Sequence, residues 1–157
     1  MSRNRKKNPY ARPVWGDRFN EPAVKDLRAD LPNGSAEIFD SMRQIMQDLD
    51  GIHEVCVWRG DAWRWTIEYR TEPSAPPLAI LIPRPDDLQL AIPFDDGEVD
   101  QLSTDQLKKT VLEGLELAQD PFDTNWGLWS LQFPGMTDQL GGLLQERLSR
   151  RRNGRAG

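Results

Sequence analysis

The stretch from Trp58 to Tyr69 constrains the fold more than any other part of the chain. Large apolar residues recur at every second position from 63 to 69, and Arg64, Thr66 and Glu68 fall between them. Side chains alternate across a β-strand, so this pattern predicts a strand over residues 63–70, with apolar groups on one face and solvated charged groups on the other. The apolar set is Trp63, Trp65, Ile67 and Tyr69. A turn at 59–62 should precede this strand, because Gly60 and Asp61 favour turns.

Other periodic patterns predict the remaining elements. Apolar residues at helical spacing predict helices over 35–50, 103–119 and from residue 137, with caps at Ser35, at Ser103 (with Gln106 closing a capping box) and at Thr137. Alternating or continuous apolar runs predict strands at 54–58, 78–82, 88–92 and 126–133. Short connections imply an antiparallel meander. The predicted fold is therefore α+β, with an antiparallel sheet of four to five strands and two or three helices packed on one face.

The length of 157 residues fits a single domain. Prolines interrupt residues 1–34, which we expect to form an irregular N-terminal arm anchored by Trp15 and Phe19, with a short helix near 23–29 after Pro22. We assign residues 35–152 to the α+β domain and residues 153–157 to a disordered basic tail.

Charge is distributed unevenly along the chain. The net charge is −5, but five basic residues lie within 1–12 and five within 147–157, which leaves residues 13–146 with a net charge of −15. Such an acidic body would repel nucleic acid, while the basic ends could touch phosphate only weakly and in a salt-dependent way. The expected partner is a protein or a small molecule, and the sequence leaves the oligomeric state open.

The location is expected to be cytoplasmic. Cys56 is the single cysteine, so no disulfide can form within the chain, and the sequence has no apolar run of about 18 residues and no secretory signal. No membrane partner is expected.

A candidate ligand site combines aromatic and basic residues near the end of the central strand. Tryptophan and tyrosine stack on planar ligands, and arginine binds carboxylate or phosphate. The candidate residues are Trp65, Tyr69, Arg70 and Arg84. The alternation argues against one flat site, because it places the arginine of the strand on the face opposite the aromatic rings.

Two other candidates favour ordinary structural roles. His53 and Cys56 have the spacing of two metal ligands, but the sequence holds no further histidine or cysteine, so a zinc site would be incomplete. The acidic run at 95–100 does not match the spacing of a calcium loop. Glycine-rich phosphate loops are missing as well. We therefore expect no metal, no cofactor and no catalytic residues.

The order of elements resembles that of a known group. A helix precedes a strand with Trp63, Trp65, Tyr69 and Arg70, and the segments from Leu78 to Pro83, from Leu88 to Pro93, at Trp126 and from Leu143 to Arg147 follow. This pattern, over about residues 35–150, resembles small bacterial proteins classed as domains of unknown function and similar to the YdhG-like domains. The resemblance implies a fold and supplies no catalytic residues.

Two function classes follow from these observations. The first is a non-enzymatic module that binds a protein or a ligand. The second is a small-molecule-binding protein or an enzyme, with a pocket at the end of the central sheet near Tyr69 and Arg70.

Overall fold

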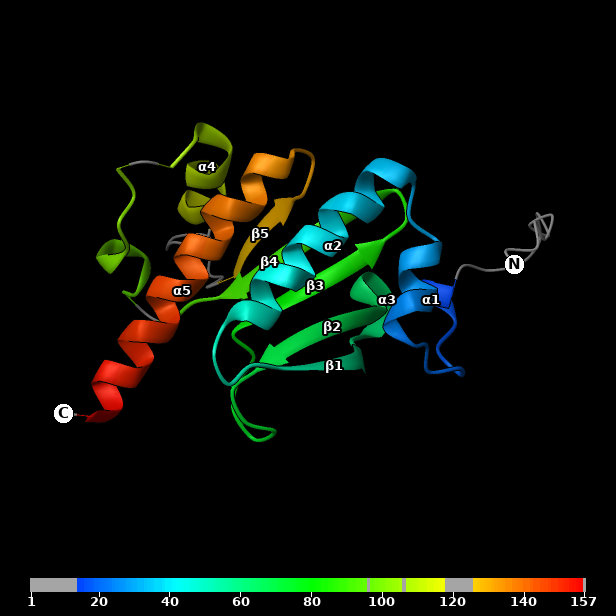
Figure 1. Cartoon of the computed structure of the whole chain (residues 1–157), viewed down its shortest axis with the longest axis horizontal. Helices are drawn as coiled ribbons and strands as arrows, with labels where there is room; N and C mark the ends of the chain where they lie inside the picture. Colours follow the sequence, from blue (N-terminus) through cyan, green and yellow to red (C-terminus); the bar gives the residue numbers. More distant parts are fainter. Residues whose placement is uncertain (1–13, 96, 106, 118–125, 157) are drawn as a thin grey trace.

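The computed structural model describes residues 14–95, 97–105, 107–117 and 126–156, which form one sheet with helices packed against it (Figure 1). The strands are β1 (His53–Trp58), β2 (Trp65–Arg70), β3 (Ala79–Arg84), β4 (Asp87–Pro93) and β5 (Trp126–Ser130). The helices are α1 (Val24–Ala29), α2 (Asn33–Asp48), α3 (Gly60–Trp63), α4 (Lys109–Leu117) and α5 (Pro134–Ala156), with 3-10 turns η1 (Val14–Gly16) and η2 (Val99–Gln101). Among these described helices, none has the length and apolar character needed to cross a membrane.

The strands form an antiparallel meander in the order β1-β2-β3-β4-β5. Each strand pairs with its neighbours in the chain, and Ile67 of β2 lies opposite Leu81 of β3. The β3–β4 connection is a tight turn, since Arg84 pairs directly with Asp87. The predicted α+β fold, with its antiparallel sheet and helices on one face, is confirmed.

Helices α2 and α5 lie side by side on one face of the sheet (Figure 1). The side chains of Ile67, Leu81 and Leu90 share that face and are fully buried in the main core. Gly141 lets α5 approach α2 closely, because a Cβ at this position would lie 2.7 Å from Ile45 Cγ2. The glycine that weakens the helix locally thus permits the packing of the helical layer.

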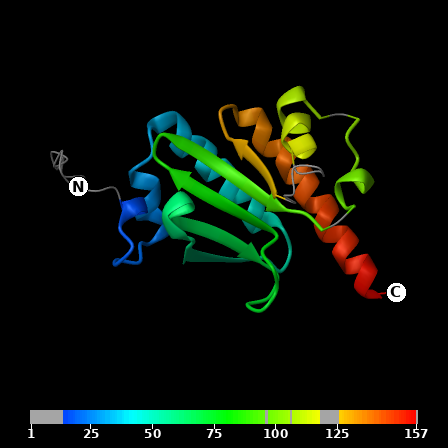
Figure 2. The same ribbon diagram turned by 180° about the vertical axis from the view of Figure 1, so that it is seen from behind.

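Among the described residues no long helix packs on the opposite face of the sheet (Figure 2), which nevertheless holds a second apolar cluster. Ile80, Ile82 and Ala91 are at most 1% exposed on this face. Trp63 and Trp126 pack against them, and their rings meet edge to face with centroids 5.5 Å apart. Two indole side chains therefore cover the part of the sheet that the helices leave open.

The prediction that Trp63 shares a face with Trp65 is wrong. The turn before β2 is a single helical turn, α3, and Arg64 then takes a φ of 57°, so strand geometry begins only at Trp65. The prediction of a solvated face opposite the aromatic residues is also wrong. Thr66 and Glu68 are fully buried there, and the Glu68 carboxylate pairs with Arg59 and Arg70.

The N-terminal segment packs on the domain from residue 14 onward. The helix predicted near 23–29 is confirmed as α1, and Trp15, Leu27 and Leu31 are buried in the main core. Phe19 is 90% exposed, so its predicted role as an anchor is wrong. Predictions for residues 1–13 lie outside the described residues.

The three predicted helix caps are wrong. Ser35 lies inside the first turn of α2, whose cap position is Pro32. The backbone N–H of Ser103 donates to Glu146 instead of opening a helix, and its predicted partner at residue 106 lies outside the described residues. Thr137 lies inside α5, and its hydroxyl donates to the Pro134 carbonyl. Pro134 is the first residue of α5 and suits that position, because a proline has no backbone N–H to satisfy.

Two predicted element ends also shift. Strand β5 ends at Ser130, so Phe133 lies beyond it and is 58% exposed. The predicted end of the second amphipathic helix, at 119, falls outside the described residues. Helix α5 continues through Ala156, into the segment assigned to the tail.

Candidate functional site

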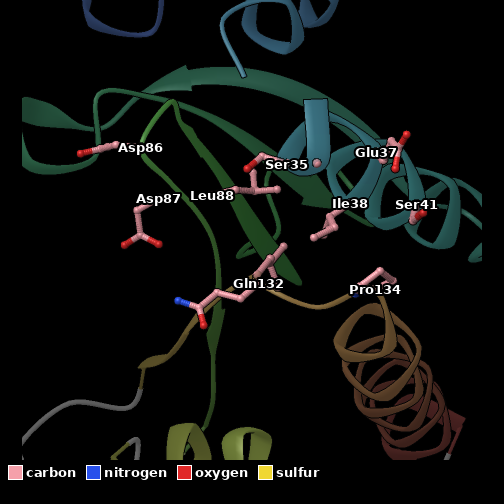
Figure 3. A pocket seen from close by; sticks show the side chains of 11 residues that line it. Ser35, Glu37, Ile38, Ser41, Asp86, Asp87, Leu88, Gln132 and Pro134 are labelled. Carbon is pink, nitrogen blue, oxygen red and sulfur yellow. The ribbon is translucent and has the colours of Figure 1, made fainter. Parts of the chain in front are cut away.

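A cavity of about 540 Å³ lies where three segments distant in the sequence meet (Figure 3). The first turns of α2 form one wall, the β3–β4 turn forms the second, and the β5–α5 connection forms the third. This volume is in the range of pockets that hold small ligands. The meander topology creates the cavity, because it brings the β3–β4 turn and the end of β5 beside the start of α2.

The floor of the cavity is apolar and well fixed. Ile38, Leu88 and Leu131 line it and are 8%, 3% and 4% exposed, respectively. The backbone N–H of Leu131 donates to the Leu88 carbonyl at 2.8 Å, which ties the β5–α5 connection to β4. The floor thus offers a preformed surface for an aliphatic or aromatic group.

The walls of the cavity are acidic. Asp86 and Asp87 lie on one side and Glu37 lies on the α2 side (Figure 3). Arg84 neutralises Asp86 in part, with its Nε 3.0 Å from the carboxylate. Asp87 accepts a hydrogen bond from Gln89 at 3.0 Å, and no cationic side chain of the described residues forms an ion pair with it. None of the described residues that line the cavity is a lysine, an arginine or a histidine.

The helix termini oppose this negative charge only in part. The N-terminal turn of α2 and Pro134 at the start of α5 both border the cavity. Each helix N-terminus carries a partial charge of about +0.5. Three carboxylates, one of them shared with Arg84, exceed the sum of these partial charges. The cavity therefore favours a ligand with a positive charge and a short apolar part.

Trp65 and Tyr69 of the predicted ligand site are core residues on the helical face. Trp65 is 7% exposed and its indole N–H donates to the Asp17 carbonyl. Tyr69 is fully buried, and its hydroxyl donates to Glu54 at 2.8 Å. Arg43 from α2 completes this network with two hydrogen bonds to the same carboxylate, at 2.8 and 3.0 Å.

The network shifts the proton affinity of both acids. Burial and the adjacent carboxylate of Glu54 raise the pKa of Tyr69 above its usual value. Burial also acts to raise the pKa of Glu54, but the hydrogen bonds from Arg43 and Tyr69 outweigh it, so this pKa is lowered. The result is a neutral phenol that donates to an ionised carboxylate, which stabilises the attachment of α2 to β1.

Arg70 and Arg84 lie on the opposite face of the sheet and at opposite ends of it, because each ends its strand and β2 and β3 are antiparallel. Arg70 is the last residue of β2. It lies beside the start of β3, because the preceding residue, Tyr69, pairs with Ala79, the first residue of β3. Arg84 ends β3 and lies over the Trp15 ring, 5.7 Å from its centroid. The structure therefore does not bring the four predicted residues into one site, and ligand binding by them stays a prediction.

Arg70 instead joins a buried ion triad that the sequence did not indicate. The Glu68 carboxylate accepts a hydrogen bond from Arg59 Nε at 2.6 Å and two more from Arg70. The Glu68 side chain is 1% exposed, whereas those of Arg59 and Arg70 are 27% and 23% exposed. One buried anion thus fixes two guanidinium groups at the surface of the open face.

His53 and Cys56 do not share a face of β1, because three positions separate them in a strand. His53 is exposed and Cys56 is half-buried, and burial raises the pKa of the thiol. In the acidic run, Glu98 pairs with Arg147 at 2.9 Å. Among the residues that the structure describes, no group of three or more His, Cys, Asp or Glu side chains is placed to hold a metal ion.

The sequence reasoning missed the acidic cavity for a simple reason. Asp86 and Asp87 read as part of a hairpin loop, and Glu37 reads as a favourable charge in the first turn of a helix. Nothing in the sequence pattern pairs residue 37 with residue 87. The only available signal was the strong negative charge of residues 13–146.

Compared with known proteins, the chain matches no protein-family model, no curated protein and no solved structure.

Proposed function

We propose that this protein is a binding module whose ligand carries a positively charged group next to a short apolar part. The observation that carries the proposal is the cavity of about 540 Å³, with its floor of Ile38, Leu88 and Leu131 and its carboxylates at Glu37 and Asp87. An ammonium or guanidinium group would lie near the carboxylates, and the attached apolar chain would lie on the floor. The low exposure of the floor residues supports binding with little reorganisation.

The acidic body supports the same proposal at longer range. A net charge of −15 over residues 13–146 attracts cations and repels anions during encounter. Binding should therefore weaken as salt is added, because the cavity walls are open to solvent and their charges are screened.

The alternative is an enzyme or ligand site near Tyr69 and Arg70. Its support is weaker, because Tyr69 is fully buried and its hydroxyl is taken by Glu54. The resemblance to YdhG-like domains is compatible with either reading, because it brings no catalytic residues.

An NMR titration of the whole chain with hexylammonium tests the proposal. The probe has one positive charge and one aliphatic chain, and hexanol serves as the uncharged control. We expect hexylammonium, and hexanol much less, to shift the methyl resonances of Ile38, Leu88 and Leu131. If the methyl groups of Ile80 and Ile82 on the other face shift instead, or if hexanol binds equally well, the proposal is wrong.

A further inference from the structure

The open face of the sheet holds an arrangement that the proposed cavity function does not use. Glu68 is buried among apolar neighbours, opposite Ile80 in β3 and Val55 in β1. Removing a carboxylate from water is strongly unfavourable unless cations compensate for it. A valine or isoleucine at position 68 would extend the apolar cluster without this cost. The main structural effect of the glutamate is to hold Arg59 and Arg70 side by side.

The triad of Glu68, Arg59 and Arg70 has N–H groups that its own hydrogen bonds do not use. The Nε of Arg59 donates to Glu68. The two Nη groups of Arg59 have no hydrogen-bond partner among the described residues. Arg70 uses its remaining donor capacity in part on the Ala75 carbonyl. Two cations on one anion leave a charge of +1, within a body that is otherwise acidic. Guanidinium groups fixed in this way suit a carboxylate or a phosphate, which accept several parallel N–H bonds.

Aromatic rings adjoin the free donors. The Arg59 guanidinium lies 5.9 Å from the centroid of the Trp126 ring, which in turn meets Trp63 at 5.5 Å. Both tryptophans are half-buried. Val55 and Leu128 lie on the same face of the sheet and are 43% and 41% exposed. A flat apolar group could lie on these rings while its charged end reaches Arg59.

We propose that this face is a second binding site, specific for an aromatic ligand with a phosphate or carboxylate group. Arg59 and Arg70 bind the anionic group, Glu68 positions both arginines, and the Trp63–Trp126 pair holds the ring. This site is independent of the cavity, because it lies on the other face of the sheet and selects the opposite charge.

Calorimetric titration of the whole chain with four probes tests the site. Phenyl phosphate combines both features, benzoate replaces the phosphate, and inorganic phosphate and phenol each lack one feature. We expect phenyl phosphate or benzoate to bind at least tenfold more tightly than inorganic phosphate and phenol, and to shift the indole N–H resonances of Trp63 and Trp126. The better of the two anions then identifies the ligand class. If neither aromatic anion binds more tightly than inorganic phosphate, the proposal fails on the unmodified protein.

Three variants separate binding from structural support. Arg59→Gln should weaken phenyl phosphate binding at least tenfold, whereas Arg28→Gln, which removes an exposed arginine paired with Asp40 on the helical side, should not change it. Glu68→Gln keeps the shape of the side chain but removes the charge that positions both arginines, so it should weaken phenyl phosphate binding while it lowers the melting temperature. A purely structural triad predicts the same loss of stability with unchanged affinity for phenyl phosphate. That outcome would overturn the proposal.

Discussion

The indole rings of Trp63 and Trp126 meet edge to face at 5.5 Å, although one ends a helical turn near the edge strand β1 and the other opens β5 at the far edge of the sheet. Their contact closes the face that the helices leave open. Beneath them Ile80, Ile82 and Ala91 lose nearly all contact with water. The protein thus has a second apolar core, which is covered by two indole side chains rather than by a long helix.

Replacing Trp126 tests this second core. Trp126→Ala should lower the free energy of unfolding by about 2 kcal/mol, less than for a fully buried tryptophan because the ring is half-buried. Trp126→Phe should keep more than half of that stability, because a ring still covers Ile82 and meets Trp63. Urea denaturation measures both. A change in the free energy of unfolding below about 0.5 kcal/mol for Trp126→Ala would contradict a stabilising role of this ring in the second core.

Arg147 is a buried cation that links α5 to the rest of the domain. It is 1% exposed and donates to Glu98 at 2.9 Å and to the Leu78 carbonyl at 2.8 Å. Arg147→Met should cost about 3–5 kcal/mol, because it leaves the mostly buried Glu98 side chain without its partner. The double variant Arg147→Met with Glu98→Gln should recover part of this loss.

The matched control for Arg147 is its neighbour one turn later. Arg150 pairs with Glu146 but is 39% exposed, so Arg150→Met should cost less than about 1 kcal/mol. Thermal unfolding of the three variants provides the comparison. Equal losses at both positions would refute the role assigned to burial.

Two adjacent glycines of α5 should respond in opposite directions. Gly141→Ala places a methyl 2.7 Å from Ile45 Cγ2, so we expect a loss of about 1–3 kcal/mol from overpacking. Gly142→Ala meets nothing within 4 Å and should gain about 0.5–1 kcal/mol from the better helix propensity of alanine. Chemical denaturation resolves both changes, and a gain at both positions would contradict the close approach of α2 and α5.

The Glu54 network makes stability depend on pH at acid values. The pKa of Glu54 is lower in the folded protein than in the unfolded chain, so the unfolded state binds the proton first as pH falls. Its contribution is fully present above about pH 4.3, the usual pKa of glutamate, and is lost as pH falls through the folded value. Glu54→Gln should lower stability at pH 7 and flatten this part of the profile. An unchanged slope between pH 5 and 3 would show that Glu54 is not linked to folding.

The sheet could be predicted from the sequence because the patterns that indicate a strand are local. Alternation along Trp65–Arg70 and along Asp87–Pro93 sets the faces of single strands, and short connections set the meander. The burial of Glu68 was missed because it depends on tertiary contacts, namely the ion pair with Arg59 from outside β2 and the packing of Trp63 and Trp126 on the apolar cluster that includes Ile80. The alternation places Trp63 on the same face as Trp65, which is wrong, because the residue pattern does not show the positive φ at Arg64.

The candidate site was still less accessible from the sequence. The aromatic and basic residues of β2 attracted the prediction by composition, but strand geometry divides them between two faces. The acidic cavity requires the start of α2, the β3–β4 turn and the β5–α5 connection to meet. Each contributes ordinary loop or helix-start residues, and only tertiary packing makes them a site.

The dissociation constant for hexylammonium, compared between the unmodified protein and Asp87→Asn, tests the central claim most directly. Asp48→Asn is the matched control, because Asp48 also accepts a hydrogen bond from a glutamine, at 2.9 Å, but lies at the far end of α2. Calorimetry should show about fivefold weaker binding for Asp87→Asn, since a partly exposed charge pair contributes up to about 1 kcal/mol, and no change for Asp48→Asn. Equal affinities for all three proteins would contradict the claim that the cavity binds a cation.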